Sequence, residues 1–369
     1  MNREVDLLVT TSPQIHHPDS TAKIMWTVVI CLVPAGIWGV FLFGGKALLV
    51  IISSIVSALV TEFIIAKLLK RFTVLDGSAF LTGLLVGYNM PPGVPLYIPA
   101  IASIFAIAVV KWTFGGLGAN WMNPALAGRV FVFFSWTGSM TNWRVPRFLT
   151  THVDGVTMAS PLGFIKAGLY DFTGTSPGPI AFLKAGGYPL SALDQSVTNW
   201  INTSVLNPLG ASLKGGYVDL FLGIVPGCIG EVSALLLLLG TVYLFIKKII
   251  TWEIPVSYLF VFGLLIWIFG GLRFNNGLFT GDVMFNFFTG GLILGVFYMA
   301  TDMVTSPLTT KGKLIFGAGA GFMTFLIRVY GSFPEGVSLA IIFMNIFVPL
   351  INKYTKPVRF GVSPRGGGK

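Results

Sequence analysis

The sequence predicts an all-α polytopic membrane protein, with about ten transmembrane helices arranged as two inverted five-helix repeats. The first observation is composition: 54% of the residues are hydrophobic and 10% are charged, whereas ordinary soluble domains carry about 25% charged residues. The second is the recurrence of apolar runs long enough to span a bilayer, with a mean hydropathy of +0.81 over the chain. The third is one polar stretch, residues 137–216, that divides these runs into two blocks. The length of 369 residues leaves no room for a separate soluble enzyme domain.

The first block contains five apolar runs. They cover residues 24–43, 47–66, 77–90, 93–113 and 124–136. The third run is short and is followed by Pro91 and Pro92, which cannot continue a regular helix. We therefore expect a broken or partly re-entrant third span.

The second block contains five further runs. They cover residues 220–246, 255–272, 283–300, 314–329 and 337–351. Residues 80–87 (FLTGLLVG) are similar to residues 288–295 (FTGGLILG), and each segment lies in the third run of its block. An odd number of spans in each half makes the two repeats inverted, which favours ligand sites near their interface. Chance recurrence of Thr, Gly and Leu in apolar helices is the alternative.

Basic residues predict the orientation, because Lys and Arg are retained on the cytoplasmic side. With residues 1–23 inside, the inner segments hold 15 of the 24 basic residues, namely Arg3, Lys23, Lys67, Lys70, Arg71, Lys111, Lys247, Lys248, Lys311, Lys313, Lys353, Lys356, Arg359, Arg365 and Lys369. This places residues 24–136 and 217–352 in the membrane, 137–216 outside, and 353–369 as a basic cytoplasmic tail. The formal charge of +10 thus reflects membrane topology rather than nucleic-acid binding. The first span lacks signal-peptide features and is expected to stay attached.

Two glycine-rich segments are candidates for ligand binding. Residues 115–120 precede Asn123-Pro124-Ala125, so a flexible loop leads into a helix whose N-terminus can bind an anionic or polar group. A tight turn capped by asparagine is the alternative. Residues 317–321 (GAGAG) lack the preceding strand of a dinucleotide fingerprint, and close helix packing through small residues explains them better.

Sparse intramembrane acids are candidates for an ion path, because burying them is costly. Asp282 and Asp302 fall near the ends of runs, so Glu62 and Glu231 are the stronger candidates. Cys31 and Cys228 lie in apolar surroundings without a metal-ligand pattern, and we interpret them as buried structural thiols.

The polar loop contains Asp154-Gly155-Val156-Thr157-Met158-Ala159-Ser160-Pro161-Leu162. An accessible hydroxyl in this segment, Thr157 or Ser160, could accept a phosphoester from a modifying enzyme. By their chemistry alone, Thr157 and Ser160 are ordinary loop residues.

Taken together, the segments resemble the RnfD/NqrB family of membrane redox subunits. The resemblance runs over nearly the whole chain, from residues 12–16 (SPQIH) through the glycine loop and Asn123-Pro124-Ala125 to residues 328–357. The most specific portion is GSFPEGV at residues 331–337, followed by MNIFVPLI at residues 344–351.

The resemblance implies FMN joined through its phosphate to a hydroxyl in the outer loop. The family pattern is Asp, two residues, Ser or Thr, one residue, Ala, then the acceptor Thr. Asp154, Thr157 and Ala159 match it, and Ser160 stands where the acceptor is expected. Serine keeps the required hydroxyl, so we expect FMN on Ser160, with Thr157 as the alternative attachment residue. The resemblance also implies a second, non-covalent riboflavin, which no residue pattern here places.

We therefore expect a flavin-bearing subunit of an ion-translocating complex in the bacterial inner membrane, coupling ferredoxin:NAD electron transfer to Na⁺ or H⁺ movement. Its expected partners are the other subunits, including a second covalent-flavin subunit, together with a flavin transferase and the lipid bilayer. Nothing in the sequence resembles an iron-sulfur ligand set, so the NAD and ferredoxin sites are expected on partner subunits. The alternatives are an NqrB-like subunit of a Na⁺-translocating NADH:quinone reductase, and a channel or carrier for a small polar solute.

Overall fold

The computed structural model describes residues 20–71, 74–149, 157–169, 174–333 and 335–356. The first membrane block folds into helices that follow the predicted runs. They are α1 (Thr21–Phe43), α2 (Gly45–Leu68), η1 (Val74–Asp76), α3 (Ser78–Tyr88), α4 (Tyr97–Phe105), its continuation η2 (Ala106–Lys111) and α5 (Pro124–Ser135). The Ser20 hydroxyl caps α1 and the Asn123 amide oxygen caps α5, as side chains of these types do at helix N-termini. Helix α3 has 11 residues and ends at Tyr88, shortly before Pro91, so the third run forms a single short helix.

The second block is less regular. It contains α10 (Tyr217–Leu222), α11 (Ala234–Ile246), α12 (Glu253–Phe269), η6 (Gly270–Phe274), α13 (Val283–Phe288), α14 (Leu292–Leu294), η7 (Gly295–Met299), α15 (Thr310–Val329) and α16 (Val337–Tyr354). The prediction of one continuous span over residues 220–246 was wrong, because residues 223–233 are not α-helical. Gly223 has a φ of 87°, a value that side-chain-bearing residues rarely adopt, and Pro226 cannot donate a helical hydrogen bond.

The non-helical segment of the second block meets the end of α3. The Ile229 amide donates to the Met90 carbonyl at 3.1 Å, and the Gly230 amide donates to the Tyr88 carbonyl at 3.0 Å. A Cβ on Gly230 would lie 2.2 Å from the Tyr88 ring, so only glycine permits this approach. The two halves are therefore joined through backbone groups that their helices leave unpaired.

The two similar glycine segments differ in structure. Residues 80–87 lie inside α3, whereas residues 288–295 span a break between α13 and α14. Gly290 and Gly291 have φ values of 65° and 64° in this break. The sequence similarity therefore does not mark equal local structure, because the third run is one uninterrupted short helix in the first block and is broken in the second.

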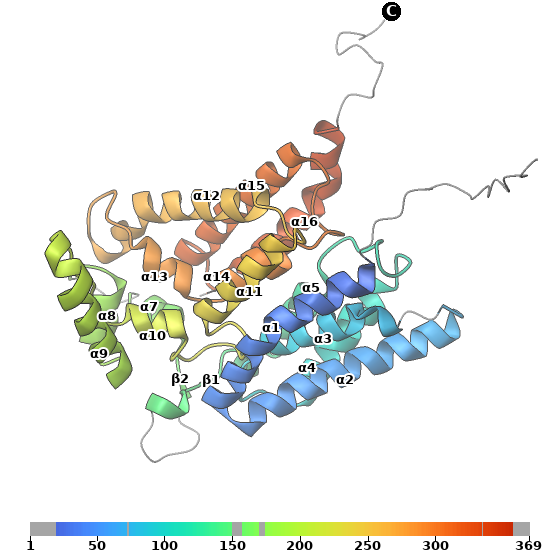
Figure 1. Cartoon of the computed structure of the whole chain (residues 1–369), viewed down its shortest axis with the longest axis horizontal. Coiled ribbons are helices and arrows are strands. Elements are labelled where there is room, and N and C mark those ends of the chain that lie inside the picture. The colour runs from blue at the N-terminus through green and yellow to red at the C-terminus, as the bar shows by residue number, and fades with distance from the viewer. Residues whose placement is uncertain (1–19, 72–73, 150–156, 170–173, 334, 357–369) are drawn as a thin grey trace, which may run out of the picture.

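The polar loop forms a small subdomain at one end of the helices (Figure 1). Its elements are α6 (Thr137–Met140), β1 (Trp143–Arg144), η3 (Arg147–Leu149), β2 (Thr157–Met158), α7 (Pro161–Gly168), α8 (Pro179–Ala185), α9 (Ala192–Ile201), η4 (Asn202–Leu206) and η5 (Asn207–Leu209). Strands β1 and β2 pair antiparallel, with Trp143 opposite Met158. The buried Asp194 carboxylate accepts the amides of Gly216 at 2.6 Å and Val218 at 3.1 Å, which ties the subdomain to α10.

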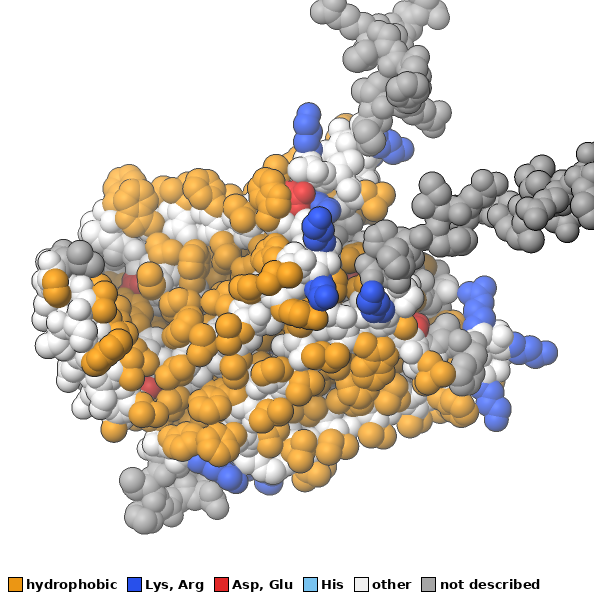
Figure 2. Space-filling model, viewed as in Figure 1, with side chains coloured by type: hydrophobic (Ala, Val, Ile, Leu, Met, Phe, Trp, Pro, Cys, Tyr) orange, Lys and Arg blue, Asp and Glu red, His pale blue; other side chains and the backbone are white. Residues whose placement is uncertain are grey.

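The helical surface is suited to lipid. In the described part of the chain, five helices, including α1, α2 and α16, are long and apolar enough to cross a membrane. Large apolar side chains cover the face in Figure 2, and several Lys and Arg side chains stand at the end opposite α8 and α9. Residues 317–321 lie inside α15, where Gly321 closely approaches the Tyr258 carbonyl of α12. These findings confirm the all-α membrane fold and the helix-packing interpretation of the GAGAG segment.

Candidate functional site

Ser160 lies where the polar loop turns into helix α7. Strand β2 ends at Met158, and Ser160 then adopts an extended backbone conformation as the N-cap of α7, with Pro161 in the first turn. The Ser160 hydroxyl oxygen accepts the Gly163 amide at 3.2 Å. The Ala159 carbonyl accepts the Tyr188 hydroxyl at 3.3 Å. The segment is thus held in place on both sides of the hydroxyl.

Ser160 is 4% exposed. It does not stand on the open surface that an accessible loop hydroxyl would occupy. It lines a small cavity of about 20 Å³, here called the tether pocket. The other walls are Pro161 and Leu162, segment 225–232, the break at residues 288–291, and Glu335.

The tether pocket is also lined by Cys228, Glu231 and Glu335, which lie close to Arg129 of α5. One Arg129 nitrogen, Nη1, lies 3.2 Å from Glu231 Oε1, and Nη2 donates to Glu335 Oε2 at 2.5 Å. The side chains of Glu231 and Glu335 are 5% and 12% exposed. Arg129 also donates to Asn89 at 3.0 Å and to Ser338 at 2.7 Å. This arrangement satisfies a buried guanidinium from both halves of the chain.

Cys228 belongs to the same group. Its thiol donates to the Asn89 carbonyl at 3.3 Å and lies 3.6 Å from Arg129 Nη2. One ligand atom each from Cys228, Glu231 and Glu335 falls within 4.8 Å of the others. Both Glu residues are already engaged by Arg129, so the arrangement is an ion-paired cluster rather than an open metal site.

Sequence reasoning identified Glu231 but missed Arg129 and Glu335. Arg129 lies inside the apolar run 124–136, and a guanidinium at membrane depth is a signal for a functional or paired site. Glu335 lies outside the predicted runs, and its only signal was its place in residues 331–337 (GSFPEGV), the most specific portion of the family resemblance.

Glu62 belongs to a separate buried cluster. Lys111 Nζ lies 2.8 Å from Glu62 Oε1, and the Trp112 indole donates to Glu62 Oε2 at 2.8 Å. The same ammonium donates to the Ser78 hydroxyl at 2.7 Å. Glu62 and Glu231 are therefore both paired with a cation, in clusters built from different residues.

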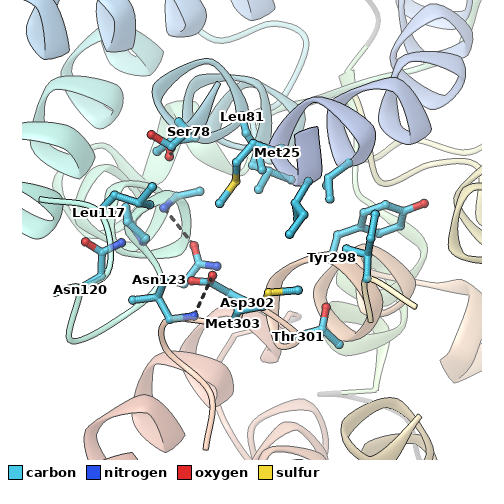
Figure 3. Close-up of a pocket in the computed structure, with 18 of the residues that line it drawn as sticks. Met25, Ser78, Leu81, Leu117, Asn120, Asn123, Tyr298, Thr301, Asp302 and Met303 are labelled. Atoms are coloured by element: carbon cyan, nitrogen blue, oxygen red, sulfur yellow. Dashed lines mark hydrogen bonds between the residues drawn. The ribbon is translucent and has the colours of Figure 1, made fainter. Parts of the chain in front are cut away.

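A larger cavity lies on the side of the glycine loop. It encloses about 110 Å³, and Figure 3 shows Asn120, Asn123, Leu117, Met25, Leu81, Tyr298, Asp302 and Met303 around it. Gly115, Gly116 and Gly118 have φ values between 96° and 117°, so this loop requires glycine. Asn123 both caps α5 and donates to the Met299 carbonyl at 3.2 Å.

One polar atom beside this cavity lacks a partner. Asn120 Oδ1 is buried and accepts no hydrogen bond from the described residues. A buried acceptor without a donor is unfavourable unless a ligand supplies one. Asn120 is one of the residues that line this cavity.

The remaining predicted residues have ordinary roles or lie beyond the described ranges. Asp282 caps α13 through the Phe285 amide at 2.9 Å, and Asp302 accepts Thr305 Oγ1 at 3.0 Å. Asp154 lies outside the described residues. Thr157 is placed in β2, paired with Arg144.

Comparison with known proteins agrees with this architecture. The model of the NQR2, RnfD, RnfE family matches residues 8–361. A component of the proton-translocating ferredoxin:NAD(+) oxidoreductase complex of Clostridium ljungdahlii is 44% identical, over 96% of each chain. The corresponding component of the Na(+)-translocating ferredoxin:NAD(+) oxidoreductase complex of Acetobacterium woodii is 40% identical, over 98% of this chain and 97% of the relative. A component of the ion-translocating oxidoreductase complex of Stutzerimonas stutzeri is 35% identical, over 94% of each chain. The chain therefore belongs to the NQR2, RnfD, RnfE family.

Proposed function

We propose that this chain is a membrane subunit of an ion-translocating ferredoxin:NAD⁺ oxidoreductase complex and that it carries FMN on Ser160. The names of the similar proteins support the complex. The observation that carries the flavin proposal is the position of Ser160, whose side chain lines a pocket together with Glu231 and Glu335. Bound FMN supplies electron transfer, and the protein supplies position and electrostatics. The sites for ferredoxin and NAD lie on partner subunits in this proposal.

The N-terminus of α7 suits a phosphoester. The Gly163 amide in its first turn donates to the Ser160 hydroxyl oxygen, and Pro161 at the first position has no N–H to leave unpaired. An anionic group at a helix N-terminus is stabilised by the unpaired N–H groups and by the helix dipole. A phosphate joined to Ser160 Oγ would therefore be held by backbone donors, since no Lys or Arg is among the described residues that line the tether pocket.

The burial of Ser160 bears on how the flavin is attached. A transferase needs to reach a hydroxyl that is 4% exposed in the folded chain. We infer that attachment occurs before α7 packs against the membrane helices, or while the segment is transiently open. Attachment requires a flavin transferase, and we also propose a second covalent-flavin subunit as a partner in the complex.

The cavity beside the glycine loop is our proposed site for the second, non-covalent flavin. Its walls are mostly apolar, and the polar groups among them are Ser78, Thr82, Lys111, Asn120, Asn123, Thr301 and Asp302. An apolar pocket with a small number of oriented polar groups is typical of a cofactor site. The partnerless Asn120 oxygen would accept a ring N–H or a ribityl hydroxyl. Replacing Asn120 by Leu should release non-covalent flavin while the covalent flavin stays.

We propose that both termini are cytoplasmic and that the chain lies in the bacterial inner membrane. Lys67 lies in the last turn of α2 and Lys70 and Arg71 follow that helix. Lys247 and Lys248 follow α11, and Lys353 lies in the last turn of α16. This clustering is expected for cytoplasmic ends. The α7–α9 subdomain, with Ser160, then faces outward.

The competing functions make different predictions. A quinone-reducing role would require a quinone acceptor, and a carrier would require no flavin. The similar proteins at 32–44% identity are named as parts of oxidoreductase complexes, which favours the redox function. The test is in-gel flavin fluorescence of the full chain after denaturing electrophoresis, following co-expression with its flavin transferase. A fluorescent band is expected, and a band without fluorescence would reject covalent attachment.

A further inference from the structure

Three cationic side chains line one small pocket beside helix α7, here called the basic pocket. Lys166 comes from α7, Arg273 from η6 and Arg328 from the end of α15. The other described lining residues include Asn286 but no Asp or Glu. The pocket therefore gathers three positive charges without a carboxylate in its walls.

The hydrogen-bond partners of these cations among the described residues are neutral carbonyls, and Arg328 also lies over the Phe262 ring at 5.2 Å. Lys166 Nζ donates to the carbonyls of Phe333 at 2.5 Å and Arg328 at 3.4 Å. Arg273 Nη1 donates to the same Arg328 carbonyl at 3.2 Å. Cations at the C-terminus of α15 are favourable, but carbonyl oxygens do not neutralise them. Two carboxylates, Glu335 and Glu231, act electrostatically on Arg328. Both of them pair with Arg129.

Arg328 has one donor left over. Its two terminal nitrogens donate to the carbonyls of Asn286 at 2.6 Å and Thr289 at 2.8 Å. Its Nε is buried and has no hydrogen-bond partner among the described residues, in a side chain that is 3% exposed. A buried, charged donor without an acceptor is unfavourable. This points to an acceptor that enters the pocket from outside the chain.

We propose that the basic pocket binds a phosphate-type oxyanion, with Arg273 and Arg328 donating hydrogen bonds and Lys166 supplying charge. The cavity of about 40 Å³ has room for about three water-sized oxygen atoms, at 10–15 Å³ each. The headgroup phosphate of a phospholipid and free inorganic phosphate share this chemistry.

The oxyanion proposed in the basic pocket is distinct from the phosphoester proposed at Ser160. Lys166 follows Ser160 by six residues, so the two lie roughly 9 Å apart along α7 at 1.5 Å per residue. The proposal therefore does not rest on flavin attachment. Burial, together with the charges of Arg273 and Arg328, lowers the pKa of Lys166 to about 8. An anion in the pocket would raise that pKa.

The first test measures binding to the full chain, delipidated in a neutral detergent. Radiolabelled inorganic phosphate is one probe, and vesicles of phosphatidylcholine with or without phosphatidylglycerol are the other. We expect saturable binding of at least one probe, weakened about tenfold or more by Arg273→Gln, since a charge-assisted hydrogen bond is lost. Arg147→Gln is the matched control, because Arg147 is exposed on η3.

The outcomes separate the two sources. Phosphate binding without lipid assigns the site to a free oxyanion, whereas selective retention of phosphatidylglycerol assigns it to a lipid headgroup. Binding of neither probe, or equal weakening by Arg147→Gln, would overturn the proposal.

A second readout covers the case in which Arg273→Gln folds poorly. Lys166 in the wild-type chain is acylated at pH 8 and quantified by mass spectrometry, with exposed Lys214 as the internal control. Occupancy by the anion should slow acylation of Lys166 severalfold, because the raised pKa lowers the reactive neutral fraction. No change at Lys166 on adding the probe that binds would contradict the proposal.

Discussion

Arg129 and Glu335 form a 2.5 Å ion pair that joins α5 of the first half to the segment preceding α16 of the second. The same guanidinium lies 3.2 Å from Glu231. One arginine thus links two carboxylates at the tether pocket, and it connects the packing of the two halves to the proposed flavin site.

Replacing Arg129 by Gln should destabilise the protein strongly. Glu231 and Glu335 would remain buried without their cation, and removing one partner of a buried pair costs about 3–5 kcal/mol. The free energy of unfolding can be measured by denaturant titration in mixed micelles. Arg147→Gln, at an exposed position, should change it by less than about 0.5 kcal/mol. Equal effects of the two variants would refute a structural role for the cluster.

The break between α13 and α14 should tolerate no side chain at Gly291. Its φ is 64°, and an added Cβ would lie 2.5 Å from Glu231 Cδ. Backbone strain and overpacking together predict a loss of about 2–4 kcal/mol for Gly291→Ala. Thermal unfolding of Gly138→Ala provides the control, because nothing lies within 4 Å of a Cβ there. A near-neutral Gly291→Ala variant would show that the break can rearrange.

The Glu62 and Lys111 substitutions should be non-additive. Lys111→Met removes the ammonium that lies 2.8 Å from the buried Glu62 carboxylate, and we expect a loss of about 3–5 kcal/mol. The double variant Glu62→Gln/Lys111→Met should lose less than the sum of the single changes, because no uncompensated charge remains. A double-mutant cycle of unfolding free energies measures this coupling. Simple additivity would mean that the 2.8 Å contact contributes nothing.

Lys166 should give the stability a pH dependence. Its pKa is lowered in the folded state to about 8 from 10.5, so the unfolded chain binds more protons between these values. Stability should therefore rise as pH increases from about 8 to 10.5, with the penalty fully present below pH 8. Because Lys166 is partly exposed, we expect the free energy of unfolding to rise by only about 1 kcal/mol. Unfolding titrations of Lys166→Met and Lys214→Met at several pH values show which residue is responsible. The rise in stability with pH should disappear in Lys166→Met and persist in Lys214→Met.

Hydropathy predicted the fold class and the long helices well, because lipid demands contiguous apolar runs. It failed over residues 220–246, where apolar residues surround a non-helical segment. Gly223, Pro226, Gly227 and Gly230 were the available signals. The reason for the break is tertiary: Ile229 and Gly230 bond to the backbone of the first half, and no local pattern contains that contact.

The site was predicted in part. Glu231 could be found from its place at membrane depth, and Arg129 could have been found in the same way. The pairing of Arg129 with Glu335 could not, because 206 residues separate them. The burial of Ser160 was also unpredictable, since it depends on packing of α7 against the second block.

Flavin attachment at Ser160 is tested most directly by mass spectrometry of proteolytic peptides covering residues 137–216, from chain co-expressed with its flavin transferase. We expect an FMN mass on the peptide containing Ser160. The mass should be absent in Ser160→Ala, where Thr157 is intact, and present in Ser160→Thr. Flavin that persists in Ser160→Ala and disappears only in Thr157→Ala would contradict the assignment, and no flavin on any of these peptides would contradict covalent attachment altogether.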